Sequence, residues 1–463
     1  MAERLPVSRS SEPAGRADPT GTADPAHPVQ RTGPADSSHR TDPADTSHRT
    51  DPASTATVDV LGLGADGWGG LATLARATLD RADVIFGSRR QLDLLPPHLS
   101  AEQVCWPSPL APALPGLLTA HPGRRVVLAS GDPTWYGIAT TIARLLPDLP
   151  LRIVPHPSSL SLACARLGWA QQEVEVISLV GRPVEILHPA ITPGRRLLVL
   201  AGGVDSPAET ARLLRNRGFA PTRLIALSDL GSAQEQRVES TAGEWPAAGA
   251  GRWPIGTAPR ALTVLGLECI AGTDANRLTR TPGLPDNAYE NDGQLTRRQI
   301  RAITLASLAP APGELLWDVG GGAGSIGIEW MRTHPTCSAI SVERDGERAN
   351  RIRRNAVALG VPGLGVVGGS APAALAGLPT PDAVFIGGGA STPGLIETCW
   401  QALPVGGRLV ANVTTVESEQ AIVSAWTSHG GELTRIEITS AAPIGRYTGW
   451  RPAMPVTQWT AIR

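Results

Sequence analysis

The sequence contains no lysine, so all 41 of its Lys and Arg residues are arginine. Schiff-base chemistry and catalysis by a lysine base are therefore excluded, whereas planar guanidinium groups that pair with carboxylates or phosphates are plentiful. Because 42 acidic residues bring the formal net charge to −1, no basic surface is indicated, and we expect no nucleic-acid partner.

Patterns of metal ligands and disulfides are also missing. The five cysteines are scattered without a CxxC pair, and the nine histidines form no HxxxH cluster, so we expect neither a metal site nor a disulfide framework. No apolar run approaches the roughly twenty residues of a membrane span, and the amino terminus carries no apolar signal region. We therefore expect a soluble, cytoplasmic protein without membrane contact.

The length of 463 residues allows two or three domains. Residues 1–56 are rich in Pro, Ala, Asp, Ser and Thr, and they repeat a short pattern at 36–43 and 45–52. Because this segment has almost no large apolar side chains, it cannot offset the entropy cost of ordering, and we predict a disordered tail with solvated histidines.

Residues 57–272 predict a mixed α/β domain. Apolar runs indicate strands that begin at residue 57 and lie at 84–87, 125–129, 151–154, 174–179, 196–200, 224–227 and 261–267. The sequence Ser130-Gly131-Asp132-Pro133 follows one of them, and ligand sites of open α/β sheets lie at such carboxyl ends. Ser158 or Ser159 is predicted to cap the helix that ends at 167, and Ser206 with Glu209 reads as a capping box.

The second half is organised around a glycine-rich turn. A strand ending at Val319 is followed by Gly320-Gly321-Gly322-Ala323-Gly324, which completes the pattern D-x-G-x-G-x-G from Asp318. Glu343 ends the next strand, where a doubly wound sheet places the carboxylate that binds ribose hydroxyls. A dinucleotide fingerprint would need glycine at Ser325, so the spacing favours S-adenosylmethionine over NAD, with an incidental glycine turn as the alternative.

The rest of this half follows a strand–helix alternation after a linker over 273–291. A helix ending at Leu308 is predicted to begin with a capping box of Thr296 and Gln299. Strands are predicted at 314–319, 339–343, 364–367, 382–386 and 408–412, and near 432–439 and 456–462. The last two have no helix between them, so we expect them to pair antiparallel beside five parallel strands.

Both halves resemble known families. The first resembles the tetrapyrrole (corrin and porphyrin) methylases in its first glycine turn and at 130–133, 136–137, 157–159 and 178–182. The second resembles a small class I (Rossmann-like) methyltransferase of cobalamin synthesis at 292–296, in the glycine turn, and at 369–372, 385–389 and 412–414. The tandem resembles the precorrin-6Y C5,15-methyltransferases (decarboxylating).

This resemblance implies a disordered tail (1–56), a tetrapyrrole methylase α/β domain (57–272) and a seven-stranded class I methyltransferase domain (273–463). It further implies that adenosylmethionine methylates precorrin-6Y, the first domain acting at carbon 5 and the second at carbon 15 with loss of the ring C acetate carboxylate, to give precorrin-8. It suggests a homo-oligomer, a dimer or a tetramer, and assigns no catalytic residue. The alternatives are a methyltransferase for another tetrapyrrole with one active domain, and a non-catalytic scaffold that binds cofactor or tetrapyrrole.

The resemblance also implies the site residues. The second cofactor site would comprise Thr296, Asp318, Gly320, Gly321, Gly322, Ala323, Gly324, Glu343, Ser370 and Ala371. The first would comprise Gly131, Asp132, Ser158 and Ser159. The candidates for tetrapyrrole contact are Gly64, Asp66, Gly67, Arg182, Arg297, Arg298 and Asn412.

Two of these expectations have plainer alternatives. Asp318 could cap the glycine turn without touching a ligand. Tyr289, Trp317, Trp330 and Trp400 could form a stacking platform for a flat ring, but we expect core packing, since Trp317 lies in a predicted strand and Trp330 in a predicted helix.

Overall fold

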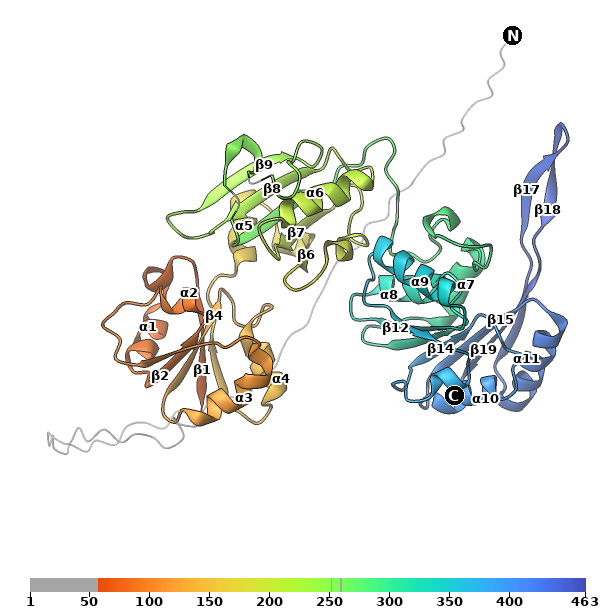
Figure 1. The fold of residues 1–463 in the computed structure, drawn as a ribbon, viewed down its shortest axis with the longest axis horizontal. Helices are drawn as coiled ribbons and strands as arrows, with labels where there is room; N and C mark the ends of the chain where they lie inside the picture. Colours follow the sequence, from red (N-terminus) through yellow and green to blue (C-terminus); the bar gives the residue numbers. More distant parts are fainter. Residues whose placement is uncertain (1–56, 251, 259) are drawn as a thin grey trace, which may run out of the picture. The chain divides into compact units, whose positions relative to one another are not determined.

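A computed structural model describes residues 57–463 except 251 and 259, and the predicted disorder of 1–56 lies outside this range. The described residues form three main sheets with flanking helices (Figure 1). No helix among them has both the length and the apolar composition to cross a membrane.

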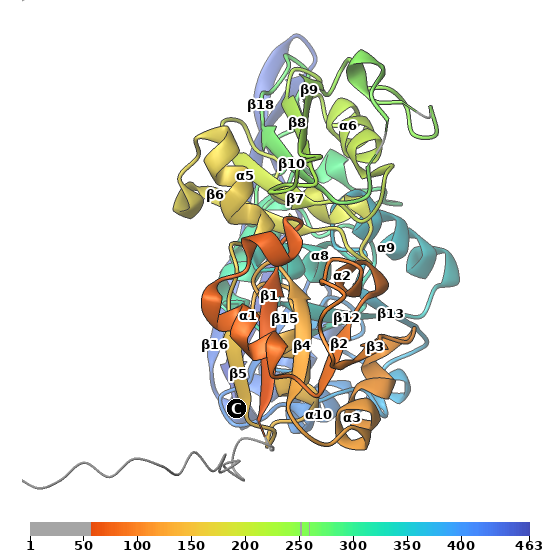
Figure 2. The ribbon, with the colours of Figure 1, turned by 90° about the vertical axis from the view of Figure 1, so that its left-hand side faces the viewer.

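The first sheet is parallel and has the strand order β3-β2-β4-β1-β5 (Figure 2). Its strands are β1 Val58–Leu63, β2 Val84–Gly87, β3 Glu102–Cys105, β4 Arg125–Ser130 and β5 Leu151–Val154. Its helices are α1 Thr73–Asp80, α2 Arg89–Leu92, α3 Leu110–Ala120 and α4 Ile138–Leu145. The strands β1, β2 and β4, which are mostly apolar, are almost entirely buried. Strand β3 was not predicted, because it is a polar, largely exposed edge strand.

The second sheet has the order β6-β7-β10-β8-β9, with β6 and β7 parallel and the other pairs antiparallel. Its strands are β6 Val174–Ser178, β7 Arg196–Leu200, β8 Arg223–Ser228, β9 Gln236–Thr241 and β10 Thr263–Glu268, with helices α5 Ser159–Leu167 and α6 Ser206–Asn216. Ser158 caps α5 by accepting from the Ser161 amide, as predicted. The capping box at Ser206 is wrong: the helix already includes Ser206, whose hydroxyl accepts from the amides of Gly202 and Gly203 instead.

The third sheet has seven strands in the order β13-β12-β11-β14-β15-β19-β16. The first five named are mutually parallel, and β19 is antiparallel to both neighbours, which confirms the predicted class I arrangement. The strands are β11 Leu315–Val319, β12 Ser338–Glu343, β13 Gly365–Gly368, β14 Ala383–Ile386, β15 Arg408–Val413, β16 Glu432–Ile436 and β19 Val456–Ile462.

Helices cover both faces of this sheet, since its central strands are apolar on both sides. One face packs against α7 Arg298–Leu308, α8 Ser325–Thr333 and α9 Gly346–Ala358. The other packs against α10 Leu395–Ala402 and α11 Val416–His429. Tyr289, Trp317 and Trp330 are buried in these two cores and Trp400 packs against the second, which confirms the core interpretation.

Two features of this part differ from the predictions. Helix α7 begins at Arg298, and no side chain in the described range caps it, so the capping box of Thr296 and Gln299 is wrong. Along the chain, a hairpin of β17 Thr439–Ile444 and β18 Tyr447–Pro452 connects β16 to β19, and it projects from the sheet (Figure 1).

Candidate functional site

The glycine turn after β11 adopts a conformation that requires its glycines. Gly320, Gly322 and Gly324 all have positive φ, at 76°, 59° and 77°. A Cβ on Gly320 would lie 2.9 Å from the Gly388 amide nitrogen, and one on Gly324 would lie 2.8 Å from Cγ2 of Ile352. The turn is therefore a bare-backbone cradle at the amino terminus of α8, of the kind that anionic or nucleotide ligands occupy.

Asp318 joins three elements beneath this turn. Its side chain is 1% exposed, and Oδ2 accepts from the Ser341 hydroxyl at 2.7 Å and from the Gly327 amide at 3.2 Å. Burial raises the pKa of this carboxyl to about 6, and the nearby Glu343 charge adds to the shift. Asp318 thus links β12 to the first turn of α8, and it also lines the cleft described next.

Glu343 is held at the carboxyl end of β12. One carboxylate oxygen accepts from the Gly322 amide at 2.9 Å and the other from the Asp345 amide at 3.0 Å. Each oxygen keeps a further lone pair, so the carboxylate can accept from a vicinal diol in the cleft.

A cleft of about 1440 Å³ opens over the glycine turn. Ligand pockets usually measure about 300–1000 Å³, so this one has room for a cofactor and a second, larger ligand. Its lining includes these predicted site residues: Thr296, Arg297, Asp318, Gly320, Gly321, Gly322, Ala323, Glu343, Ser370, Ala371 and Asn412. Two predicted residues are engaged elsewhere, because Gly324 faces Ile352 and Arg298 donates through Nε to the Gly283 carbonyl at 2.8 Å.

Asn412 is oriented by polar partners on two sides. Its Nδ2 donates to the Thr304 hydroxyl at 2.7 Å, and its Oδ1 accepts from Gln458 Nε2 at 2.9 Å. The side chain therefore has a fixed rotamer at the carboxyl end of β15.

Sequence reasoning missed an apolar wall of the same cleft. Ile436, Ile438, Met454 and Val456 line it from the ends of β16 and β19 and from the base of the hairpin. The sequence contained a signal for this wall, since these apolar residues lie in or next to the two terminal strands that were predicted near 432–439 and 456–462.

The first sheet carries a second candidate site. A Cβ on Gly62 would lie 2.2 Å from the Gly131 carbonyl oxygen, and one on Gly131 would lie 3.2 Å from the Ser158 Cα. The carboxyl ends of β1 and β4 and the start of α5 thus come together, bringing Gly131, Asp132, Ser158 and Ser159 into one neighbourhood.

A cavity of about 330 Å³ adjoins this point and is lined by Gly64, Asp66 and His156. Asp66 Oδ1 lies 3.5 Å from His156 Nε2. Sequence reasoning missed His156, although it follows the predicted strand at 151–154. Of the other candidates, Gly67 opens a turn that packs against Leu94, and Arg182 is exposed.

No group of three or more His, Cys, Asp or Glu side chains within 57–463 is arranged to hold a metal ion.

Comparison with known proteins agrees with this two-part geometry. Residues 57–246 match the family of tetrapyrrole (corrin/porphyrin) methylases, and residues 287–463 match the precorrin methyltransferase domain.

Several relatives match along most of the chain. A precorrin-6Y C(5,15)-methyltransferase (decarboxylating) of Sinorhizobium sp is 45% identical over 401 residues, which cover 87% of this chain and 95% of that protein. The Mycobacterium tuberculosis protein of the same name is 42% identical over 405 residues, covering 87% and 99%. A crystal structure of the C-terminal domain of the Rhodobacter capsulatus protein is 45% identical and covers 40% of this chain and 99% of that chain, with a TM-score of 0.38.

Proposed function

Since this chain belongs to the family of precorrin-6Y C(5,15)-methyltransferases (decarboxylating), we propose that it methylates precorrin-6Y at carbons 5 and 15 and removes the ring C acetate carboxylate, giving precorrin-8. The chain is an adenosylmethionine-dependent methyltransferase, and residues of both parts suit that cofactor. Family membership along 87% of the chain supports this function over a single active domain or a scaffold.

The two reactions are divided between the two parts. Residues 273–463 act at carbon 15 and release carbon dioxide, and residues 57–272 act at carbon 5. The observation that carries the first assignment is the cleft of about 1440 Å³, which places Glu343 and the glycine cradle beside space for a macrocycle.

The role of the residues is mainly positional. When bound, adenosylmethionine supplies an already activated sulfonium methyl group. The Gly320–Gly322 backbone would lie under its methionine part, Glu343 would accept from the ribose hydroxyls, and Ser370 with Ala371 would lie near adenine. Alignment of two reactants is worth up to about 7–11 kcal/mol, so no catalytic acid or base is assigned.

The macrocycle would lie on the opposite side of the cleft. The apolar wall of Ile436, Ile438, Met454 and Val456 suits a flat ring, and Asn412 presents a fixed amide beside it. Arg297, 67% exposed at the same cleft, is a candidate partner for ring carboxylates.

Product mass spectra of two variants test the division. In the full chain, Glu343→Gln should abolish both methylation at carbon 15 and the release of carbon dioxide, because the carboxylate that would bind the ribose hydroxyls of the cofactor is gone. Gly131→Val should spare that reaction and abolish methylation at carbon 5, because its φ of 62° and the nearby Ser158 backbone exclude a branched side chain.

Mixing the two variants controls for the order of the two reactions, because each variant can then act on the product of the other. The mixture should restore the doubly methylated, decarboxylated product, since each variant keeps one working site. Loss of carbon dioxide by the Glu343→Gln variant alone would refute the assignment.

We also infer that the chain is a homo-oligomer, either a dimer or a tetramer. Within the described chain β17 and β18 pair only with each other, and Ile444, Tyr447 and Trp450 are 60%, 66% and 75% exposed. An isolated two-stranded hairpin is marginal in water, and exposed apolar patches mark interaction surfaces, so a second copy would stabilise it. Light scattering should give a smaller mass for Trp450→Ser than for the parent chain; equal masses would leave the hairpin without this role.

A further inference from the structure

The segment from Tyr289 to Thr296 covers the glycine turn. A Cβ built on Gly322 would lie 3.1 Å from the Gln294 carbonyl oxygen, so the segment's backbone directly contacts the cradle. Residues 293–297 all line the cleft. Any shift of this segment therefore changes the shape of the cofactor site.

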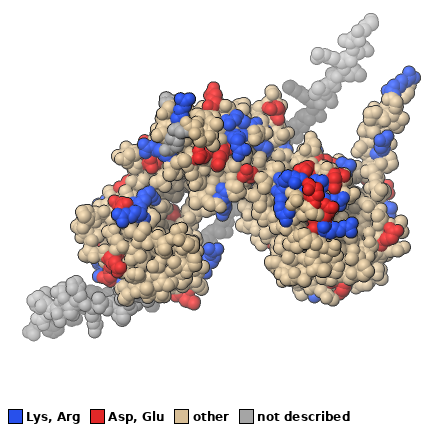
Figure 3. Space-filling model, viewed as in Figure 1, with Lys and Arg blue, Asp and Glu red and all other residues tan. Residues whose placement is uncertain are grey.

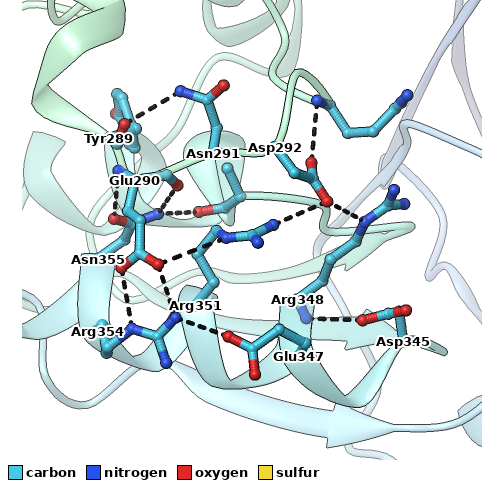
Figure 4. A network of polar contacts seen from close by, with 12 residues as sticks. Tyr289, Glu290, Asn291, Asp292, Asp345, Glu347, Arg348, Arg351, Arg354 and Asn355 are labelled. Atoms are coloured by element: carbon cyan, nitrogen blue, oxygen red, sulfur yellow. Dashed lines mark hydrogen bonds and ion pairs between the residues drawn. The ribbon is translucent and has the colours of Figure 1, made fainter.

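One face of α9 holds the middle of this segment through ion pairs. Asp292 Oδ2 accepts from Arg348 Nε at 2.9 Å and lies 2.9 Å from Arg351 Nη1, while Asp292 Oδ1 accepts from the Gln294 amide at 3.1 Å (Figure 4). The Arg351 side chain is only 12% exposed and Asp292 is 33% exposed, so these pairs are partly shielded from water. Arg348, followed by Arg351, holds the pKa of the Asp292 carboxyl well below its usual range.

The same face of α9 carries a second pair that lies further from the cleft. Both carboxylate oxygens of Glu290 accept from Arg354, at 2.7 and 2.9 Å, and Glu347 also contacts Arg354 at 3.0 Å. In the space-filling view these charges gather as a mixed blue and red patch over α9 (Figure 3). Arg348 lines the cleft, whereas Arg354 is not among the residues that line it.

The two ends of the segment are anchored independently of Asp292. The Glu290 amide donates to Asn355 Oδ1 at 2.9 Å, and Asn355 Nδ2 donates back to the Glu290 carbonyl at 2.9 Å. At the other end the Thr296 carbonyl accepts from the buried Arg301 guanidinium. Removing the Asp292 charge therefore leaves the segment attached and frees only its middle.

We propose that Asp292 is a positioning residue for cofactor binding: through Arg348 and Arg351 it fixes the Asp292-to-Thr296 turn against Gly322, and so completes the adenosylmethionine site. The proposal rests on the proposed function in one respect, that adenosylmethionine occupies this cleft. Supporting residues of this kind hold a binding backbone within a fraction of an ångström of its productive place.

Calorimetric titration of the full chain with adenosylmethionine tests this. The parent chain and Glu343→Gln are measured first, and the binding class that weakens in Glu343→Gln is that of the cleft. In Asp292→Asn the same class should weaken about tenfold, a typical size for the coupling between two linked elements. Asp292→Glu, which keeps the charge, should recover part of that loss, and the other binding class should not change.

Glu290→Gln is the matched control, since it removes one negative charge from the same cluster, where Glu290 hydrogen-bonds Arg354 and lies 3.8 Å from Arg351 Nε. If Asp292 acts by positioning, Glu290→Gln should change the affinity for adenosylmethionine only slightly. Asp292→Asn should then lose affinity equally for adenosylmethionine and for neutral adenosylhomocysteine. A general charge effect would weaken both variants alike and would weaken only the cationic cofactor, which would overturn the proposal.

Two other outcomes remain distinct. If the parent chain binds at the cleft and Asp292→Asn binds equally well, the positioning role is wrong and the proposed function stands. If Glu343→Gln weakens no binding class, the cleft is not the cofactor site, and the proposed function fails together with this inference. High salt should reproduce part of the Asp292→Asn loss in the parent chain, because it screens partly exposed ion pairs.

Discussion

The buried carboxyl of Asp318 should couple adenosylmethionine binding to the release of a proton. Its pKa of about 6, against an ordinary 3.8, arises first from burial. A cationic sulfonium in the cleft that Asp318 lines would favour the ionised form. At pH 6 about half of the free chains hold this proton, so binding should release about half a proton from Asp318.

The same value sets the pH dependence of affinity. At pH 5, ionising the carboxyl costs about 1.4 kcal/mol, which corresponds to about a tenfold weaker affinity than at pH 7, where the group is already mostly ionised. In the absence of ligand the sign is the reverse of the usual carboxylate case. As pH rises from about 4 to about 6 the unfolded chain loses the proton first, so the free energy of unfolding falls by up to about 3 kcal/mol across that window.

The assay is calorimetry at pH 6 in two buffers with different ionisation enthalpies, for the parent chain and for Asp318→Asn. The difference in protons released between the two proteins isolates Asp318, whatever other groups titrate. Adenosylhomocysteine, which lacks the sulfonium charge, should release less. Equal proton release by the parent and Asp318→Asn would refute the reasoning.

Two further predictions concern packing. Glu329→Gln should lower the free energy of unfolding by about 1–3 kcal/mol in urea denaturation, because the fully buried Arg301 loses its 2.7 Å carboxylate partner and keeps only Asp286 at 3.0 Å; an unchanged midpoint would contradict this. Gly62→Ala should cost about 1–3 kcal/mol and abolish methylation at carbon 5, because its Cβ would meet the Gly131 carbonyl oxygen at 2.2 Å. Gly69→Ala, whose Cβ meets no atom of the described chain within 4 Å, should change neither quantity, and equal losses in the two variants would show that crowding is not the cause.

The third sheet was predictable because each of its parallel strands has a clear sequence signal. The segments at Asp318, Glu343 and Phe385 are short apolar runs separated by helical stretches, and this alternation restricts the topology to a parallel sheet. The proximity of the glycine turn and Glu343 followed from that topology, since parallel strands bring their carboxyl ends to one edge, whereas Ser370 was implied only by the family resemblance.

The two failed capping boxes show what local patterns omit. Ser206 and Thr296 both have suitable side chains three residues before Glu or Gln, but tertiary contacts decide their use. The Ser206 hydroxyl accepts from two loop amides, and the Thr296 carbonyl accepts from the Arg301 guanidinium, so neither residue serves as a helix cap.

The residues that sequence reasoning missed have their function only through long-range proximity. His156, in the loop after β5, faces Asp66 in the turn after β1, and Asp292 meets Arg348 and Arg351 across more than fifty residues of chain. The hairpin was missed because Thr439–Ile444 and Tyr447–Pro452 are exposed along almost their whole length, with no buried face to produce an alternating apolar pattern.

The position of β19 has a consequence for how the chain is made. Strand β16 leaves the ribosome before β19, yet it contacts β15 only through β19, which inserts between them. Until β19 emerges, both neighbours expose open hydrogen-bonding edges, and Asn412 lacks the Gln458 amide that orients it. A nascent chain halted before Val456–Ile462 would therefore be a target for chaperones or proteases, and the cleft beside Asn412 would be complete only after this strand has been made.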